Sequence, residues 1–227
     1  MRTTLLRNIS WLYTCDQQDA VMTNAYVCVT DGRIASIGQE PCPITNADEE
    51  IDLEGHLVTP GLINLHHHFY QTLTRAVPEA DRTNGLDWLF SLYPLWAGLD
   101  PEAMYWSSMT AIAELVKSGA TTVADHSYLA PGGSFDYVQN QVSAARALGV
   151  RFHLVRGSMV TIEGDLATRL KPVLGEARLT RLLDDEAELP ARLEAALALH
   201  DPSPFSMLRI ALGPTGVTYA KPQLMKL

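Results

Sequence analysis

The sequence predicts an α/β protein in which a parallel sheet, alternating with helices, follows a small β-rich unit. Two observations predict this fold class. Residues 1–59 divide into short segments with strand-like patterns, separated by turn residues. From Pro60 onward, apolar segments with many β-branched residues alternate with helical stretches, which is typical of successive βα units. We therefore predict two domains, residues 1–59 and residues 60–227.

Residues 1–59 are expected to form the N-terminal part of a small β-sandwich. Their strand-like segments are TLLRNISWLYTC, AYVCVTDGRIASIGQ and EEIDLEGHLVTP. In the second segment, Asp31 and Gly32 stand between two apolar runs, and an Asp-Gly pair in that position is a strong signal for a tight hairpin turn.

Four apolar segments after residue 60 are predicted to be the strands of the parallel sheet. They are residues 61–68, 120–126, 150–157 and 207–214. An order of strand, helix, strand and helix fits either a doubly wound sheet or a (β/α)₈ barrel, and composition does not choose between these two folds.

The helix between the first two strands is marked at both ends. Asp100 stands where an N-cap is expected, Pro101 suits the first helical position, and Gly119 suits the end of a helix. A second helix is expected to end at Gly149. The acidic stretch 174–200 is expected to form one weaker helix, or two that are interrupted by Pro190.

The charge of the chain argues against two classes of partner. The chain has 17 Lys and Arg against 26 Asp and Glu, a formal net charge of −9, so nucleic acid and an anionic membrane surface would both repel it. We therefore expect a small molecule as the ligand. Cys15, Cys28 and Cys42 show no CxxC spacing and are interpreted as free thiols, which indicates the reducing cytoplasm. No apolar run predicts a signal peptide or a membrane span.

The first predicted strand ends in three consecutive histidines, His66, His67 and His68. Side chains on a strand alternate between its two faces, so His66 and His68 are expected to point one way and His67 the other. Two imidazoles about 7 Å apart on one face can bind the same divalent cation. The C-terminal ends of parallel strands are also where barrel enzymes place their active sites. The motif therefore predicts a metal site, with His67 in a structural role.

Longer stretches around this motif resemble the amidohydrolase superfamily. The segments are PGLINLHHHFYQTLTRAVP, GLDWLFSLYPLW, GATTVADHSYL and VRFHLVRGSM. They are similar to the branch that contains 8-oxoguanine deaminase, isoxanthopterin deaminase and the s-triazine hydrolases. The resemblance implies a (β/α)₈ TIM barrel, of which residues 60–227 are the first four βα units, with a small β-sandwich domain and one zinc, or iron, at the barrel mouth. The family's strand-one ligand pair maps onto His66 and His68.

The resemblance also implies a reaction. A bound divalent ion activates water, the water adds to a ring carbon that bears an amino group, and ammonia leaves. We therefore expect hydrolytic deamination of amino-substituted purine-like or pterin-like rings. The family's remaining ligands and its acid–base Glu follow later strands, so we expect them to be missing from a chain that stops after strand four. The catalytic acid or base is accordingly unassigned, and this chain alone is expected to be inactive.

Three residues are predicted to face the substrate. Gln71 lies three residues beyond the ligand pair, and its amide suits the alternating donors and acceptors of a purine or pterin edge. Arg156 ends the third strand and carries donors for a ring carbonyl. Trp96 belongs, with Trp88, to an aromatic segment suited to cover a flat ring. The alternative for each is ordinary packing, a surface loop or a salt bridge.

Two residues at the end of the second strand are given supporting roles. Asp125 is interpreted as structural, or as a partner of a residue that binds the metal. His126 is interpreted as structural, with a hydrogen bond to a metal ligand as the alternative.

Two other functions stay open. An s-triazine hydrolase that expels chloride or an alkylamine shares the same ring chemistry. A non-catalytic half-barrel would serve instead as an assembly piece. Four parallel strands without their partners leave an unpaired edge, so we expect homo-oligomers or association with the missing C-terminal half.

Overall fold

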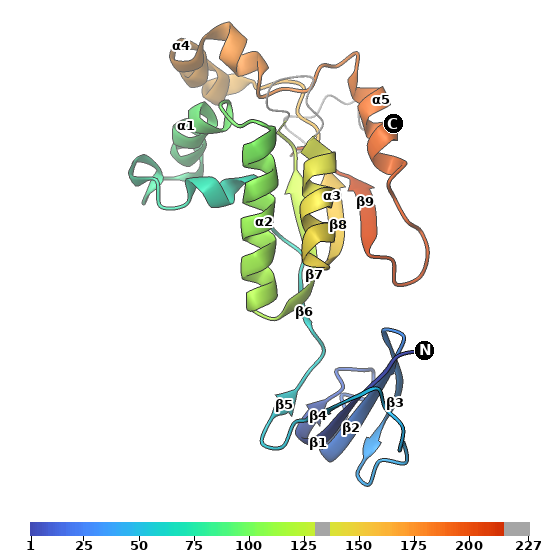
Figure 1. The fold of residues 1–227 in the computed structure, drawn as a ribbon. Helices are drawn as coiled ribbons and strands as arrows, with labels where there is room; N and C mark the ends of the chain where they lie inside the picture. Colours follow the sequence, from blue (N-terminus) through green and yellow to red (C-terminus); the bar gives the residue numbers. More distant parts are fainter. Residues whose placement is uncertain (130–136, 216–227) are drawn as a thin grey trace. The chain divides into compact units, whose positions relative to one another are not determined.

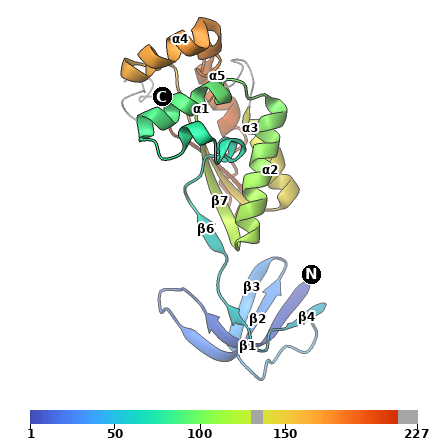
Figure 2. The ribbon, with the colours of Figure 1, turned by 90° about the vertical axis from the view of Figure 1, so that its left-hand side faces the viewer.

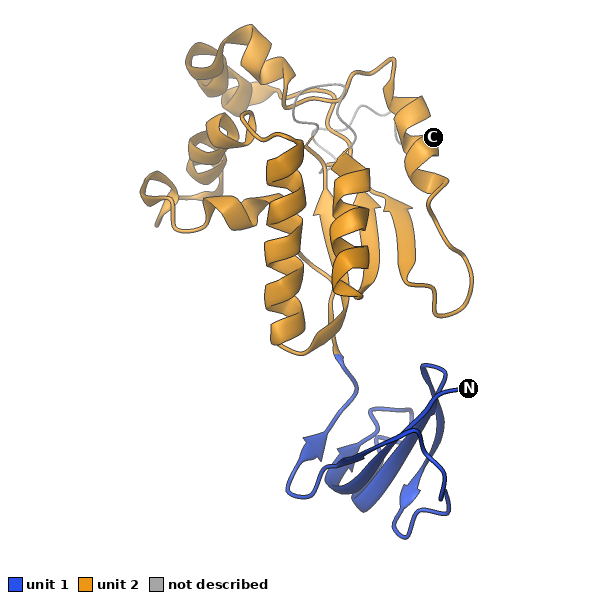
Figure 3. Ribbon diagram, in the orientation of Figure 1, with its two compact units in different colours: residues 1–61 blue, residues 62–227 orange. Residues whose placement is uncertain are grey.

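The chain folds into two compact units, Met1–Gly61 and Leu62–Leu227 (Figure 3). The computed structural model describes residues 1–129 and 137–215. The division between the units falls close to the predicted boundary at residue 60, where the β-rich pattern gives way to alternating strands and helices.

Unit 1 is a twisted sheet of five strands (Figure 1). The strands are β1 Thr3–Tyr13, β2 Val21–Thr30, β3 Arg33–Gln39, β4 Glu49–Asp52 and β5 Leu57–Val58. The order is β3-β2-β1-β4, and β5 also pairs with β1. The β2–β3 hairpin closes through Asp31 and Gly32, which have φ of 49° and 76°, so the predicted tight turn is present.

Apolar side chains pack on both faces of this sheet. One cluster includes Ile9, Leu12, Ala25 and Val27, and another includes Leu5, Tyr26 and Cys28. Within residues 1–61 the described strands form one sheet, so the second sheet of the expected sandwich is not supplied by this part of the chain.

Unit 2 contains four parallel strands in sequential order. They are β6 Leu62–Asn64, β7 Ala120–Ser127, β8 Arg151–Arg156 and β9 Leu208–Leu212, paired as β6-β7-β8-β9. All four predicted strands are present. A doubly wound sheet reverses its strand order at a switch point, whereas the strands of a barrel follow one another around the axis, so this order is that of the first strands of a barrel.

Helices cover one face of the parallel sheet. The helical segments are η1 Phe69–Thr74, η2 Pro78–Ala80, α1 Gly85–Trp96, α2 Pro101–Lys117, α3 Tyr137–Leu148, α4 Gly164–Thr180 and α5 Leu189–Leu197. Helices α2 and α3 lie side by side along β7 and β8 in both ribbon views (Figures 1 and 2). The side chains of Phe152, Leu154 and Ile210 alternate toward this covered face and are buried in the main core.

Helix α2 begins and ends where the sequence predicts. The Asp100 side chain accepts a hydrogen bond from the amide of Ala103 at 2.8 Å, and Pro101 occupies the first turn. Gly119 ends the helix with φ of 93°, a conformation that favours glycine. Met104 and Ala111 lie two turns apart on the same face of the helix, and both are fully buried.

The segment before β9 differs from the prediction. Helix α4 begins at Gly164, earlier than expected, and is kinked at Gly175, which has φ of 68° and ψ of 167°. Pro190 does not interrupt a helix but stands in the first turn of α5, where its missing N–H removes no hydrogen bond. Among the described helices, none is both long and apolar enough to cross a bilayer.

We predict that Asp100→Ala destabilises unit 2 by about 1 kcal/mol, because the Ala103 amide loses its acceptor at the start of α2. Urea unfolding followed by tryptophan fluorescence measures the loss. Asp100→Asn is the matched control, since the amide oxygen still caps the helix and stability should stay near that of the parent protein. An equal loss in both variants would contradict the capping role.

Candidate metal centre

The three histidines follow the first strand of unit 2 rather than forming part of it. Strand β6 ends at Asn64, and the segment from Leu65 to His68 has no regular secondary structure, so the predicted strand 61–68 is shorter than expected. The rings of His66 and His68 nevertheless converge. Their centroids lie 5.4 Å apart, with the two planes at 88°.

The His68 ring is oriented by the next strand. Its Nδ1 lies 2.6 Å from the backbone oxygen of His126 in β7. A carbonyl oxygen only accepts, so Nδ1 carries the proton and Nε2 keeps its lone pair for a ligand. Burial lowers the pKa of His68 below the usual value for histidine, which favours the neutral ring that metals bind. The hydrogen bond to a metal ligand that the sequence suggested for His126 is therefore made by its backbone oxygen, which accepts from His68. The ring of His126 bonds instead to the backbone oxygen of Gly213 at 2.8 Å.

Asp125 lies one residue earlier on β7, on the face covered by helices. Its carboxylate is fully buried, accepts a hydrogen bond from the Phe69 amide at 2.7 Å, and is also bonded by the side-chain amide of Gln141 in α3. Loss of water on burial raises the pKa of Asp125 to about 7, and the two donated hydrogen bonds oppose this rise. The carboxylate thus contacts the main chain next to His68, in keeping with the supporting role predicted for it.

The donor set fits part of a zinc or iron site. Imidazole nitrogen suits both metals, and His66 and His68 supply two such ligands. In residues 1–129 and 137–215, no group of three or more His, Cys, Asp or Glu side chains is placed to hold a metal ion. An open cavity of about 260 Å³ lies beside the pair, lined by His66, His67, His68, Gln71, Thr72 and Arg75.

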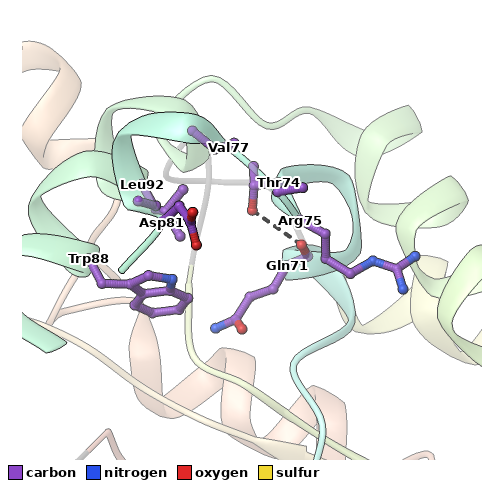
Figure 4. Close-up of a pocket in the computed structure, with 9 residues that line it drawn as sticks. Gln71, Thr74, Arg75, Val77, Asp81, Trp88 and Leu92 are labelled. Atoms are coloured by element: carbon purple, nitrogen blue, oxygen red, sulfur yellow. Dashed lines mark hydrogen bonds between the residues drawn. The ribbon is translucent and has the colours of Figure 1, made fainter. Parts of the chain in front are cut away.

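Gln71 also lines a second cavity, of about 290 Å³. Trp88 and Leu92 of α1 form its apolar wall, and Figure 4 shows Gln71 and Trp88 bordering the same space. The guanidinium of Arg75 points away from it and binds both carboxylate oxygens of Glu114. Gln71 therefore borders both the cavity beside the histidines and the cavity beside α1. Arg75, which lines both cavities, was not singled out from the sequence, although it follows Gln71 by one helical turn.

Trp96 is not on the cavity wall. Its side chain is fully buried behind the cavity, packs edge-on against Tyr70, Trp88 and Tyr93, and donates from Nε1 to Thr74 Oγ1 at 3.1 Å. Trp88, eight residues earlier on the same helix, is the tryptophan that reaches the cavity. Helical spacing alone does not tell which of the two faces the core.

Arg156 is also engaged within the protein. It is 3% exposed, forms an ion pair with Asp184 at 2.6 Å, and lies over the ring of Tyr137 with its central carbon 4.9 Å from the centroid. These contacts hold the end of β8 and do not involve either cavity described above. Of the three predicted substrate contacts, the structure thus brings Gln71 to the histidines and places Arg156 and Trp96 in the core.

Comparison with known proteins identifies the family. Residues 57–226 match the model of the amidohydrolase family. The chain belongs to the amidohydrolase family. Fold and family agree, because the sequential parallel strands of unit 2 are the first half of the TIM barrel of these metal-dependent hydrolases.

Several curated amidohydrolases are similar to this chain over most of its length. The chain is 37% identical over 229 residues to 8-oxoguanine deaminase of Pseudomonas aeruginosa, a match that covers 100% of the chain and 48% of that protein. It is 34% identical over 235 residues to hydroxydechloroatrazine ethylaminohydrolase of Pseudomonas sp. strain ADP, covering 98% of the chain and 47% of that enzyme. Isoxanthopterin deaminase from an unknown prokaryotic organism is 33% identical over 175 residues, covering 75% and 34%.

Solved amidohydrolase structures share the fold. Atrazine chlorohydrolase of Arthrobacter aurescens TC1, in complex with zinc, superposes with a TM-score of 0.83 at 29% identity, covering 97% of this chain and 48% of that one. The chain thus spans about half the length of the relatives it matches. The resemblance inferred from the histidine motif and its neighbouring segments is confirmed at the level of the family.

We predict that Asp184→Ala lowers the free energy of unfolding by about 3–5 kcal/mol, because the buried Arg156 guanidinium loses its charged partner. Denaturant titration measures the change. Glu114→Ala removes the partner of Arg75 in an exposed ion pair and should cost less than about 1 kcal/mol. Similar costs for the two variants would show that Arg156 does not depend on Asp184.

Proposed function

We propose that this protein is a metal-dependent aminohydrolase acting on amino-substituted purine-like or pterin-like rings of the 8-oxoguanine or isoxanthopterin type. The observation that carries the proposal is the converging pair His66 and His68, with His68 fixed in the tautomer that leaves Nε2 available, beside a cavity that Gln71 lines. The similarity to 8-oxoguanine deaminase over the whole chain supports this substrate class.

The two imidazoles hold the metal in this proposal. A bound zinc or iron ion supplies a Lewis acid and lowers the pKa of its water. Zinc is favoured because a related amidohydrolase was solved in complex with it, and iron is the alternative. The remaining ligands come from outside the described residues, since catalytic zinc sites use three protein ligands or more.

Gln71 and Trp88 recognise the ring. The side-chain amide of Gln71 offers both a donor and an acceptor, which match the alternating edge of an oxopurine or a pterin. Trp88 and Leu92 present an apolar wall to the face of a flat ring. These residues orient the carbon that carries the amino group without taking part in bond making.

Proton transfer to the departing nitrogen is not assigned to Asp125. Its two oxygens are bonded by Phe69 and Gln141 on the helix-covered face of β7, and a catalytic acid must reach the reacting atoms. The proposal therefore takes this proton from a residue that the described part of the chain does not contain.

Hydrolysis of an s-triazine is the second candidate function. It is favoured by the similarity to hydroxydechloroatrazine ethylaminohydrolase, which is nearly as strong as that to 8-oxoguanine deaminase. The same pair of histidines and the same amide suit a triazine ring, so the assay below includes one.

The proposal extends to the cellular compartment and the assembly state of this enzyme. We place it in the cytoplasm, because Cys15, Cys28 and Cys42 are all free thiols. We also propose that it works as a homo-oligomer or together with a complementary half-barrel, since β6 and β9 are the open edges of the described sheet.

We predict that His66→Ala and His68→Ala each abolish zinc binding, because either change leaves only one imidazole of the converging pair. Isothermal titration of the metal-free protein with ZnCl₂ measures the uptake. His56→Ala is the matched control: this ring is exposed in unit 1 and bonds only to a backbone oxygen in the described structure, so zinc uptake should be unchanged. Undiminished uptake in the His66 and His68 variants would remove the basis of the proposed function.

We predict that Gln71→Leu raises KM more than tenfold with a smaller effect on kcat, because the loss of a substrate hydrogen bond costs about 1–3 kcal/mol. Ammonia release is assayed with guanine, 8-oxoguanine, isoxanthopterin and a hydroxytriazine, using protein that contains the remaining strands. Gln139→Leu, on the exposed surface of α3, is the control. An unchanged KM for every accepted ring would argue against contact with Gln71.

A further inference from the structure

We propose that the end of β7 is a clamp that positions the metal ligand His68, and that Asp125 is the positioning residue at its centre. The clamp consists of Asp125 and His126 together with the segment His67–Phe69 that they hold. This inference rests on the proposed function, because it explains how the same metal site keeps its shape.

The histidine segment needs such support because its own strand ends too early. The pairing of β6 with β7 stops at Asn64 and Val123, and no strand pairing continues through His66 and His68. A segment without a ladder samples many backbone conformations unless other groups fix it. Precise placement of a metal ligand therefore has to come from hydrogen bonds outside the ladder.

Three hydrogen bonds from two consecutive residues of β7 supply that placement. The amide of His126 donates to the backbone oxygen of His67 at 3.0 Å. The oxygen of His126 accepts from His68 Nδ1 at 2.6 Å, and the Asp125 carboxylate accepts from the amide of Phe69 at 2.7 Å. The residues on both sides of His68 and its ring are thus all tied to β7.

Asp125 can do this because neighbouring residues of a strand point to opposite faces. Its carboxylate lies under the helices, where Gln141 of α3 binds the second oxygen. The Phe69 ring is held in the same layer, stacked on Phe152 of β8 at 5.6 Å between centroids. Phe69 is therefore fixed through both its amide and its ring, and this fixes the exit of the chain from His68.

The part of the clamp formed by His126 is held on the face of β7 opposite to Asp125. The His126 ring bonds through Nε2 to the oxygen of Gly213, just after β9. A Cβ on Gly157 would lie 3.0 Å from that nitrogen, and 2.5 Å from the Cβ of Tyr128, so a side chain at this position would push the ring away. Glycine after β8 thus leaves the space in which the His126 ring reaches across to β9.

The first test measures the tautomer of His68 and the exchange rate of the Phe69 amide in metal-free protein, so it does not depend on catalysis or on zinc. Nitrogen-15 NMR of the parent protein should show His68 in the single tautomer with hydrogen on Nδ1, and a slowly exchanging Phe69 amide. In Asp125→Leu the acceptor for the Phe69 amide is gone, and we expect mixed His68 tautomers and at least tenfold faster exchange of that amide. Asp125→Asn keeps an oxygen for Phe69, and its NH₂ can meet the Gln141 oxygen after that amide turns, so it should restore the parent spectrum.

The second test is the affinity for zinc alone. We expect Asp125→Leu to weaken binding about 10–100-fold, as is usual when a group that orients a metal ligand is removed, and Asp125→Asn to bind like the parent. Ile112→Ala is the control for general loss of stability, because it deletes a fully buried side chain of α2 that makes no part of the clamp. It should leave the His68 tautomer and the zinc affinity unchanged.

The outcomes separate this inference from the proposed function. If the parent protein binds no zinc, the proposed function fails, while the tautomer and exchange measurements still decide on the clamp. The clamp is overturned if Asp125→Leu keeps the parent spectrum, or if Ile112→Ala alters it equally. Should Asp125→Leu fail to fold, Gln141→Leu removes only the donor to Asp125 and should give the same changes in smaller measure; an unaltered spectrum in that variant would also overturn it.

Discussion

The hydrogen bond from the imidazole of His68 to the carbonyl of His126 is the interaction on which the candidate centre depends. It fixes the tautomer of His68, and it joins the segment that follows the first barrel strand to the end of the second strand. The carbonyl itself is held in place by the register of β7 against β8. In the proposed metal site, the irregular histidine segment can hold His68 in a fixed orientation because a regular strand lies beside it.

The face of the parallel sheet that the helices cover has a structural role. The face under α2 and α3 is largely apolar, and its strands carry two buried charged residues, Asp125 and Arg156. Each meets a partner from a helical or loop segment, Gln141 or Asp184, so desolvation is offset by hydrogen bonds. Both groups hold the ends of strands, and neither lines the two cavities that Gln71 borders.

Much of the fold could be predicted from residue patterns because those signals are local. The Asp31-Gly32 turn, the Asp100 cap and Gly119 act within a few residues of themselves, and the four apolar segments all became parallel strands. The limits of the first strand were wrong, because pairing with β7 and not composition decides where β6 ends. Pro190 was misplaced for a related reason: a proline that suits the first turn of a helix also suits an interruption.

The sequence by itself determined the family, the order of the elements, and the pair of histidines whose spacing suits a metal. Tertiary structure alone decided which of the other polar and aromatic residues join that pair. Gln71 reached the cavity, while Trp96 turned into the core and Arg156 met Asp184, 28 residues further along the chain. The physical reason is that burial and pairing depend on neighbours brought together by folding, and the local pattern around a tryptophan or an arginine carries no record of them.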